Sequence, residues 1–275
     1  MKTLINFIFL IIGLLFLSCQ KLEQITYPEY YRNFQQVEQY LDSNEIELAV
    51  SKFDSISNKI PHLPSSDLFK MARMCANNNY CDLAVKYLKQ SLINGQEYGK
   101  GIGPYKIIEG CKNEIAQILL QESEIHKHQF NYKYKSQIDS MFQADQKARI
   151  ESDFEKVRVI DSMNMINLLS YINELGYPSE KLIGHASAQN AFIMLLHMDR
   201  DKKNKIFKPI LDKAYNEGQI WPRGYAWIID RRRAWGGEKL EPYYYHMPSK
   251  EFENYSKEQI NEINIRRDSI GLEPK

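Results

Sequence analysis

An internal repeat constrains the fold of this chain more than any other feature of its sequence. Leu48-Ala49-Val50 followed by Phe53 recurs as Leu83-Ala84-Val85 followed by Leu88, at an offset of 35 residues. Apolar residues recur at helical spacing from Tyr30 onward. A repeat of this length is typical of a pair of helices that buries its apolar face only by stacking on a neighbouring pair. The sequence therefore predicts an all-α chain that begins with stacked helical hairpins.

The offset and the two-helix layout resemble tetratricopeptide repeats. Ala49 and Phe53 match the small and aromatic positions of that family's second helix, and Ala84 matches in the second copy. Tyr40 matches the aromatic position of the first helix, where the second copy has Cys75 instead. The resemblance implies tetratricopeptide-like hairpins with a groove for a peptide or protein partner.

Two copies of the repeat are fewer than a free-standing solenoid needs, since each pair is stabilised by its neighbours. We therefore expect the two repeat pairs, within a tetratricopeptide-like region over residues 30–125, to pack against a helix around residues 105–125 or against the C-terminal half. Helix pairs also stack simply to bury their apolar faces, so a purely structural role is the alternative to a partner-binding groove. The sequence leaves both interpretations open.

The first 18 residues are typical of a secretory signal peptide. The single charge of Lys2 precedes an apolar run from Leu4 to Leu17, shorter than the about 20 residues that span a membrane. Phe16-Leu17-Ser18-Cys19 resembles the lipobox of bacterial lipoproteins, in which signal peptidase II cuts before a diacylated cysteine. The resemblance implies an exported protein of the bacterial cell envelope, lipid-anchored to a membrane through Cys19, with residues 19–29 as a tether. A plain cleaved signal is the alternative.

Charge and cysteine content disfavour nucleic acid and metal ions as partners. Lys2 is the only charged residue of the leader, so the remaining chain has 35 basic and 35 acidic residues, a balance that disfavours nucleic-acid binding. Cys75, Cys81 and Cys111 have no zinc-site spacing, and the sequence implies no metal or other cofactor. A bridge between Cys75 and Cys81 is conceivable, but two or three buried free thiols are the favoured interpretation.

Residues 184–233 predict three consecutive helices. In the first, Ala188 and Ala191 share one face, while Asn190 and His197 fall on the other beside further apolar residues. A helix that is apolar on nearly its whole circumference is normally buried. His197 is therefore expected in or beside the interior, either as a structural histidine hydrogen-bonded to Asp199 or a carbonyl, or as a functional group.

Several helix ends carry their own signals. Gly218 suits the left-handed residue after a helix over residues 206–215, and Pro222 suits the first turn of the next helix. Ser256-x-x-Gln259 predicts a capping box for a last helix that Gly271 closes. Asp161 is expected to cap a helix that ends at a Gly-Tyr-Pro turn.

Six short motifs occur in order across the second half of the chain. They are DQ-x-x-R at Asp145–Arg149, D-x-x-N at Asp161–Asn164, G-Y-P at Gly176–Pro178, Ile183-Gly184, H-x-D at His197–Asp199 and A-x-x-x-D-R at Ala226–Arg231. Their order resembles a bacterial domain of unknown function that is often fused behind tetratricopeptide-like helices in exported proteins. The resemblance implies an all-helical bundle domain over residues 136–273, without an established activity.

The boundary between the two halves is predicted at residues 126–136, which are polar and aromatic without clear helical spacing. His126 and His128 lie on different helical faces there, so they make a poor metal pair and are expected to be exposed. Asp145 and Arg149, beyond the boundary, are four residues apart and can pair on one helix face.

No strong catalytic motif is present: the chain has no G-x-S-x-G elbow, no H-E-x-x-H and no phosphate loop. Mixed-sign groups on otherwise apolar helices remain as candidate site residues, since such groups often titrate abnormally, although structural ion pairs do so too. The candidate catalytic residues are His197, Asp199 and Asp230, and the ligand-binding candidates are Gln146, Arg149 and Arg231.

Two functions are compatible with these patterns. The favoured hypothesis is a binding or scaffold module that holds a partner at a bacterial membrane surface. The alternative is a hydrolase in which His197 is the general base, oriented by Asp199 or Asp230, and Arg231 holds an anionic or carbonyl group. Neither hypothesis names a ligand or substrate.

Overall fold

The computed structural model describes residues 23–98, 111–127, 129–198, 207–236, 242–243, 252–253 and 255–275. The regular structure in these ranges is helical, without a β-strand, which confirms the predicted all-α class. None of the helices in these ranges has the length and apolar character that crossing a bilayer requires. The predicted leader with Cys19 and the candidate Asp199 lie outside the described residues.

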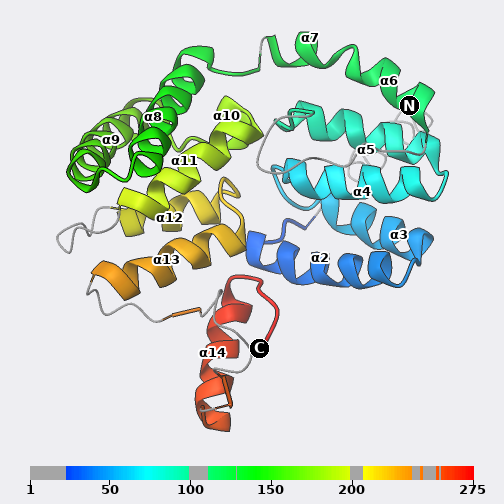
Figure 1. Ribbon diagram of the computed structural model, residues 1–275. Helices are drawn as coiled ribbons and strands as arrows, with labels where there is room; N and C mark the ends of the chain where they lie inside the picture. The colour runs from blue at the N-terminus through cyan, green and yellow to red at the C-terminus, as the bar shows by residue number, and fades with distance from the viewer. Residues whose placement is uncertain are drawn as a thin grey trace, which may run out of the picture.

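Consecutive helix pairs form the first part of the N-terminal half, as Figure 1 shows in blue and cyan. The first pair is α2 (Tyr27–Asp42) with α3 (Ile46–Ser57), and the second is α4 (Ser65–Asn77) with α5 (Cys81–Ile93). Both pairs use the same turn, in which the Glu45 N–H donates to the Tyr40 carbonyl at 2.8 Å and the Tyr80 N–H donates to the Cys75 carbonyl at 2.9 Å. The same backbone turn thus recurs at the offset of 35 residues at which the sequence repeats.

The repeated apolar positions face a shared core. Ala49, Phe53, Ala84 and Leu88 are all fully buried, and the ring of Phe53 meets that of Tyr87 edge-on at 5.4 Å. Small alanines let the paired helices approach closely, and the larger side chains fill the space between pairs. Stacking of the two pairs therefore explains why the sequence repeats.

Helix α2 begins inside the stretch predicted as a tether, which ended at residue 29. Thr26 and Glu29 form a capping box, and Pro28 lies in the first turn, where its missing N–H costs no hydrogen bond. Tyr27 is already buried against the body of the protein. Residues 27–29 are therefore part of the folded domain.

The cysteines differ from the expectation of free buried thiols. Cys81, at the start of α5, forms a disulfide with Cys111, whose Cα is 5.4 Å away, whereas Cys75 is free and buried. The chain returns to α5 when it begins α6 (Lys112–Leu119), which brings Cys111 beside Cys81. The bridge considered between Cys75 and Cys81 does not form.

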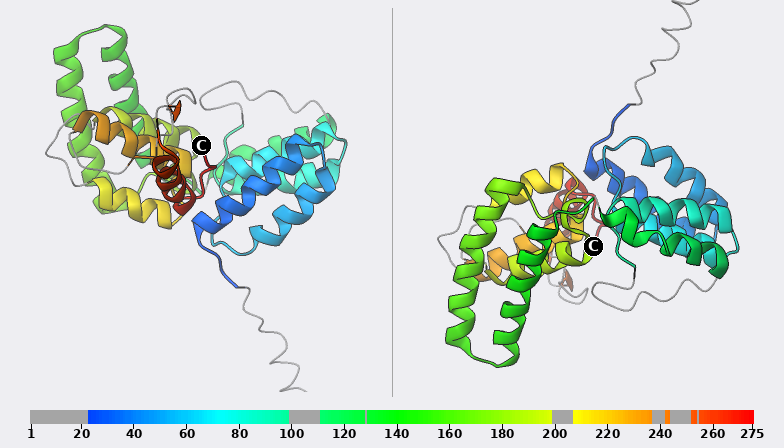
Figure 2. Two further views of the ribbon diagram at one scale, coloured as in Figure 1. Left: turned by 90° about the horizontal axis from the view of Figure 1, so that it is seen from below. Right: turned by 90° about the horizontal axis from the view of Figure 1, so that it is seen from above.

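The helices after residue 120 complete the fold. They are α7 (Glu122–Lys127), α8 (Tyr132–Ile150), α9 (Phe154–Leu175), α10 (Glu180–Ile183), α11 (His185–Met198), α12 (Phe207–Asn216), α13 (Pro222–Gly236) and α14 (Lys257–Ser269). Helices α8 and α9 form a long hairpin that projects from the body of the molecule (Figure 2). Helix α11 packs against this hairpin and α13, while α14 packs against α2. The predicted helix-end roles of Gly218, Pro222, Ser256 and Gly271 are confirmed.

His126 is packed into the interior, in contrast to its predicted exposure. The His126 ring is buried, lies with Nε2 3.2 Å from the Leu92 carbonyl and stacks on Phe130 at 4.6 Å. His128 is outside the described residues. Helix α8 then begins at Tyr132, because Asn131 caps it by accepting from a backbone N–H of its first turn.

The predicted helix cap at Asp161 is wrong. Asp153 caps α9 instead, accepting from the Lys156 N–H at 3.0 Å, so the helix begins two turns earlier. In the turn before α9, Ser152 has φ of 56°, in the left-handed region. This conformation interrupts the helix between α8 and α9. Asp161 is consequently a mid-helix side chain that points toward α8 and bonds to Arg149.

Candidate functional site

Three of the predicted site residues meet at one carboxylate where α8 and α11 cross. Asp145 has only 1% of its side chain exposed. It accepts hydrogen bonds from Gln146 at 2.7 Å and from Arg149 Nη2 at 2.8 Å. Nδ1 of His197 lies 3.0 Å from the same carboxylate. We call these four residues, together with Asp161, the Asp145 centre.

Arg149 bridges the two carboxylates of the Asp145 centre, bonding to Asp145 and to Asp161 on α9. Burial acts to raise the pKa of Asp145, but hydrogen bonds from His197 and Arg149 outweigh it and hold that pKa well below its usual range. Burial raises the pKa of Asp161 to about 6, helped by the neighbouring charge of Asp145. The centre thus joins α8, α9 and α11 through one guanidinium and one imidazole.

Among the remaining sequence candidates, Asp230 and Arg231 do not join this centre, and Asp199 lies outside the described residues. Asp230 accepts a hydrogen bond from the backbone N–H of Tyr243 at 2.7 Å, which ties α13 to the C-terminal segment. Within the ranges described, neither Asp230 nor Arg231 shares a hydrogen bond or ion pair with Asp145, Arg149 or His197. Asp145 therefore takes the orienting position that the sequence hypothesis gave to Asp199 or Asp230.

A pocket with a partly apolar lining lies elsewhere, between the N-terminal helices and the C-terminal helices. Its volume is about 410 Å³, and none of the residues of the Asp145 centre lines it. Helices α2 and α4 form one wall, and α10, α11, the turn before α13 and the chain end form the other. Its lining includes Tyr31, Phe34, Gln35, Glu38, Asp67, Glu180, His185, Ala188, Gln189, Trp221, Arg223 and Glu273.

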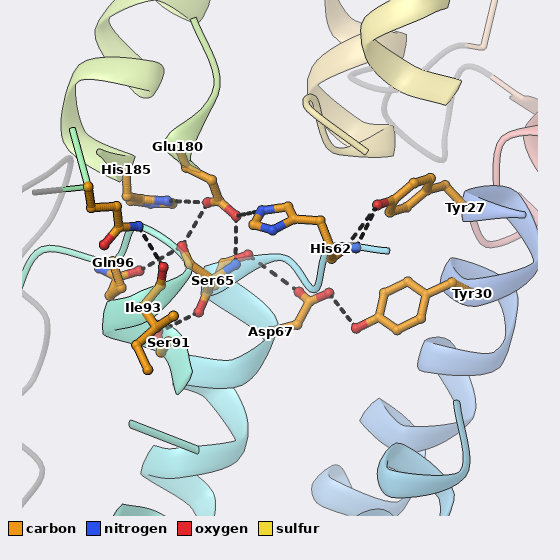
Figure 3. Close-up of polar contacts among 12 residues, drawn as sticks. Tyr27, Tyr30, His62, Ser65, Asp67, Ser91, Ile93, Gln96, Glu180 and His185 are labelled. Atoms are coloured by element: carbon orange, nitrogen blue, oxygen red, sulfur yellow. Dashed lines mark hydrogen bonds and ion pairs between the residues drawn. The ribbon is translucent and has the colours of Figure 1, made fainter. Parts of the chain in front are cut away.

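Glu180 is the most highly bonded carboxylate of this pocket (Figure 3). It accepts from the Ser65 N–H at 2.6 Å and the Ser65 hydroxyl at 2.7 Å. Nδ1 of His185 lies 3.1 Å from it, and Nε2 of His62 lies 3.6 Å from it. Burial acts to raise the pKa of Glu180, but the bond to His185 and the approach of His62 lower it to about 2. Glu180 is therefore ionised at neutral pH.

Sequence reasoning missed Glu180 because its partners come from other parts of the chain. Glu180 begins α10, directly after the Gly-Tyr-Pro turn and Ser179. Gly95 has φ of 110°, and a Cβ there would lie 2.2 Å from the Glu180 carbonyl oxygen. This close approach lets the Gly95 carbonyl accept from the His185 N–H at 2.8 Å. The only signal for Glu180 in the sequence was an acidic residue after a turn motif. This signal does not identify Ser65 as its partner.

Asp67 is the second half-buried carboxylate that lines the pocket. The Tyr30 hydroxyl donates to it at 3.1 Å, and Figure 3 shows this pair on the α2 side. Burial raises the pKa of Asp67 to about 7, and the charges of Glu38 and Glu180 act in the same direction. Two carboxylates of the same pocket therefore have pKa values shifted in opposite directions, that of Glu180 to about 2 and that of Asp67 to about 7.

Aromatic side chains form the apolar part of the pocket. Tyr31 and Phe34 come from α2, and Trp221 comes from the turn before α13. The Trp221 ring is held by Phe192 of α11, with ring centroids 5.0 Å apart. These side chains are positioned by packing within each half, so the wall is formed before any ligand binds.

The described residues contain no group of three or more His, Cys, Asp or Glu side chains that could hold a metal ion.

One stretch of the chain is similar to a known protein family. Residues 25–145 match a family of unknown function (DUF6014). The matched stretch includes both helix pairs and runs through most of α8 to Asp145, so it crosses the boundary predicted at residues 126–136. It overlaps the domain of unknown function suggested by the motifs only at residues 136–145. No curated protein matches the chain, and no solved structure matches it.

Proposed function

We propose that this protein is a binding module of the bacterial envelope, tethered to a membrane through acylated Cys19, whose ligand lies in the pocket between its two halves. The observation that carries this proposal is the pocket of about 410 Å³. Its volume is within the range of roughly 300 to 1,000 Å³ typical of small-molecule sites. Its lining combines aromatic walls with a few convergent polar groups, which is also typical of such sites.

The position of the pocket supports binding as its role. Glu180 of α10 bonds to Ser65 of α4, so the two walls are held at a set distance beside the pocket. The Gln35 amide of α2 donates to the Gly271 carbonyl at 2.9 Å, which holds the chain end against the same wall. A ligand in the pocket would contact both halves and would stabilise the folded state by mass action.

A pocket-filling variant tests this proposal. Ala188 lines the pocket, so Ala188→Phe places a ring inside it, whereas Ala116→Phe adds the same ring on an exposed face of α6. A small-molecule library is screened by melting temperature on the full chain. We expect compounds that raise the melting temperature of the natural protein and of Ala116→Phe, but not of Ala188→Phe. Compounds that stabilise all three proteins equally, or no stabilising compound, would refute a pocket ligand.

The membrane tether is tested separately. Cells that express the protein are labelled with a fatty-acid analogue, and the natural chain is compared with Cys19→Ser. We expect label and membrane fractionation of the natural chain only. An unacylated mature N-terminus at another residue would leave the plain cleaved signal as the explanation of the leader.

A second candidate function is hydrolysis at the Asp145 centre. The geometry that favours it is the pairing of His197 Nδ1 with Asp145, which leaves Nε2 as the nitrogen that could take a proton. Asp145 replaces Asp199 and Asp230 in this hypothesis. The test is turnover of ester and phosphoester probes by the natural protein and by His197→Asn. Activity that His197→Asn loses without a change in melting temperature would support the hydrolase.

A further inference from the structure

We infer that the pocket takes a small organic cation, an ammonium or guanidinium group carried on an apolar body. This inference rests on the proposed binding function and adds the chemical class of the ligand. It is carried by the balance of charges in the lining and by the aromatic walls beside the carboxylates.

The pocket lining has more carboxylates than cations. Glu38, Asp67, Glu180 and Glu273 line it, against the single guanidinium of Arg223. Arg223 is already 3.0 Å from Glu273, so its charge is shared with a carboxylate of the same wall. An anionic ligand would meet this excess of negative charge, whereas a cation would reduce it.

Asp67 is the carboxylate best suited to receive a cation. Glu38 is paired with Lys70 at 2.6 Å, and Glu180 is bonded to Ser65 and His185, with His62 Nε2 3.6 Å away. In the described part of the chain, by contrast, the hydrogen bonds to Asp67 come from the hydroxyls of Tyr30 at 3.1 Å and Ser66 at 3.4 Å. A ligand ammonium at Asp67 would supply the bonded cation that this carboxylate lacks.

The aromatic walls suit the same chemistry. Tyr31 and Phe34 lie on α2, next to Tyr30, and Trp221 faces the pocket from the other half. An organic cation is attracted to the faces of aromatic rings and also buries its apolar body against them. A hydrated inorganic cation would use neither contribution. The pocket volume of about 410 Å³ has room for such an organic group.

Binding of a cation at Asp67 should release a proton. Burial raises the pKa of Asp67 to about 7, and a cation beside it favours the ionised form. The groups that face Asp67 are Tyr30, Tyr31 and Glu38 of α2, Lys70 of α4 and Glu180 of α10. With a pKa near 7, the ionised fraction of Asp67 rises about tenfold between pH 6 and pH 8, and affinity for a cation should rise with it.

Matched probes test the inference on the full chain by calorimetry. They are 2-phenylethylamine, 2-phenylethanol and 3-phenylpropanoate, which share a ring and differ in charge. We expect the amine to bind at least tenfold more tightly than the alcohol, with the carboxylate weakest. Titrations in buffers of different ionisation enthalpy should show proton release for the amine alone.

Variants separate the inference from the proposed function. Asp67→Asn should abolish the preference for the amine and the proton release, whereas Asp82→Asn, the same change at an exposed position of α5, should keep both. If Asp67→Asn does not fold, the pH dependence of amine binding by the natural protein decides. Alcohol or carboxylate binding that equals amine binding and is blocked by Ala188→Phe overturns the cation and leaves the pocket standing. If none of the three probes binds, the cation is overturned, and the library screen with Ala188→Phe decides the pocket function.

Discussion

Glu180 and Ser65 lie 115 residues apart in the sequence and share two hydrogen bonds, at 2.6 and 2.7 Å. The carboxylate receives both the backbone N–H and the hydroxyl of Ser65, at the first residue of α4. One side chain of α10 thereby satisfies a helix-start N–H in the other half of the molecule. This contact lies beside the pocket and joins the two walls that form it.

Glu180→Gln should weaken the association of the two halves. The charge-assisted bonds to Ser65 and His185 are lost, and such bonds contribute roughly 1.5 to 3 kcal/mol each, so we expect a loss of about 2 kcal/mol in the free energy of unfolding. Urea denaturation measures it. The control is Glu155→Gln, whose side chain is 83% exposed, and it should change stability little. Equal effects of the two changes would contradict the role of Glu180.

Acid should remove the contribution of Glu180. Its pKa is about 2 in the folded protein and near 4.5 when unperturbed, so the unfolded state binds the proton first as the pH falls. The stabilisation is therefore complete above about pH 4.5 and is lost as the pH falls toward 2. Melting temperatures from pH 2 to pH 6 should show a shallower acid decline for Glu180→Gln than for the natural chain. Parallel curves would show that Glu180 does not titrate as the structure indicates.

Asp67 should give a pH dependence of the opposite sign. Its pKa is raised from 3.8 to about 7, so the folded state holds a proton that the unfolded state has released. The contribution of Asp67 to stability therefore falls as the pH rises from about 4 to about 7. Asp67→Asn stays neutral and should flatten the decline in melting temperature over this window. A decline that persists unchanged in Asp67→Asn would have to come from other groups.

Arg149→Ala should destabilise the protein because it leaves Asp145 and Asp161 facing each other without the bridging guanidinium. Removing one member of a buried ion pair typically costs 3 to 5 kcal/mol, and with 21% of the Arg149 side chain exposed we expect about 2 kcal/mol. Arg158→Ala, on an exposed face of α9, is the control and should change stability by less than about 0.5 kcal/mol. An unchanged melting temperature with lost turnover or ligand binding would instead assign the Asp145 centre to the hydrolase.

Reduction of the disulfide between Cys81 and Cys111 should lower the free energy of unfolding. The bridge closes a loop with a sequence separation of 30, for which the chain-entropy relation gives roughly 3 to 4 kcal/mol. Denaturation of the natural chain and of Cys111→Ser, each with and without reductant, measures it. Cys75 is the internal control, because it is buried and burial raises the pKa of its thiol to about 11, so it should resist alkylation until the protein unfolds. Reductant sensitivity that Cys111→Ser retains would contradict this bridge.

Local sequence rules determined the helices and many of their ends. Periodicity predicted an all-α chain, the offset of 35 residues predicted two equivalent pairs, and the positive φ of Gly218 follows from its place after α12. The pairing of Asp145 with Arg149 was also predictable, since residues four apart on a helix are neighbours. Each of these relations spans a few residues or repeats at a regular distance, so the sequence alone expresses it.

Only the tertiary structure decided which side chains from distant elements meet. It brought His197 to Asp145, Cys111 to Cys81 and Glu180 to Ser65, none of which follows from spacing along the chain. The physical reason is that burial of the apolar helix faces sets how the two halves pack, and polar groups then pair with whatever that packing places beside them. A pocket between the two halves exists only once they have docked.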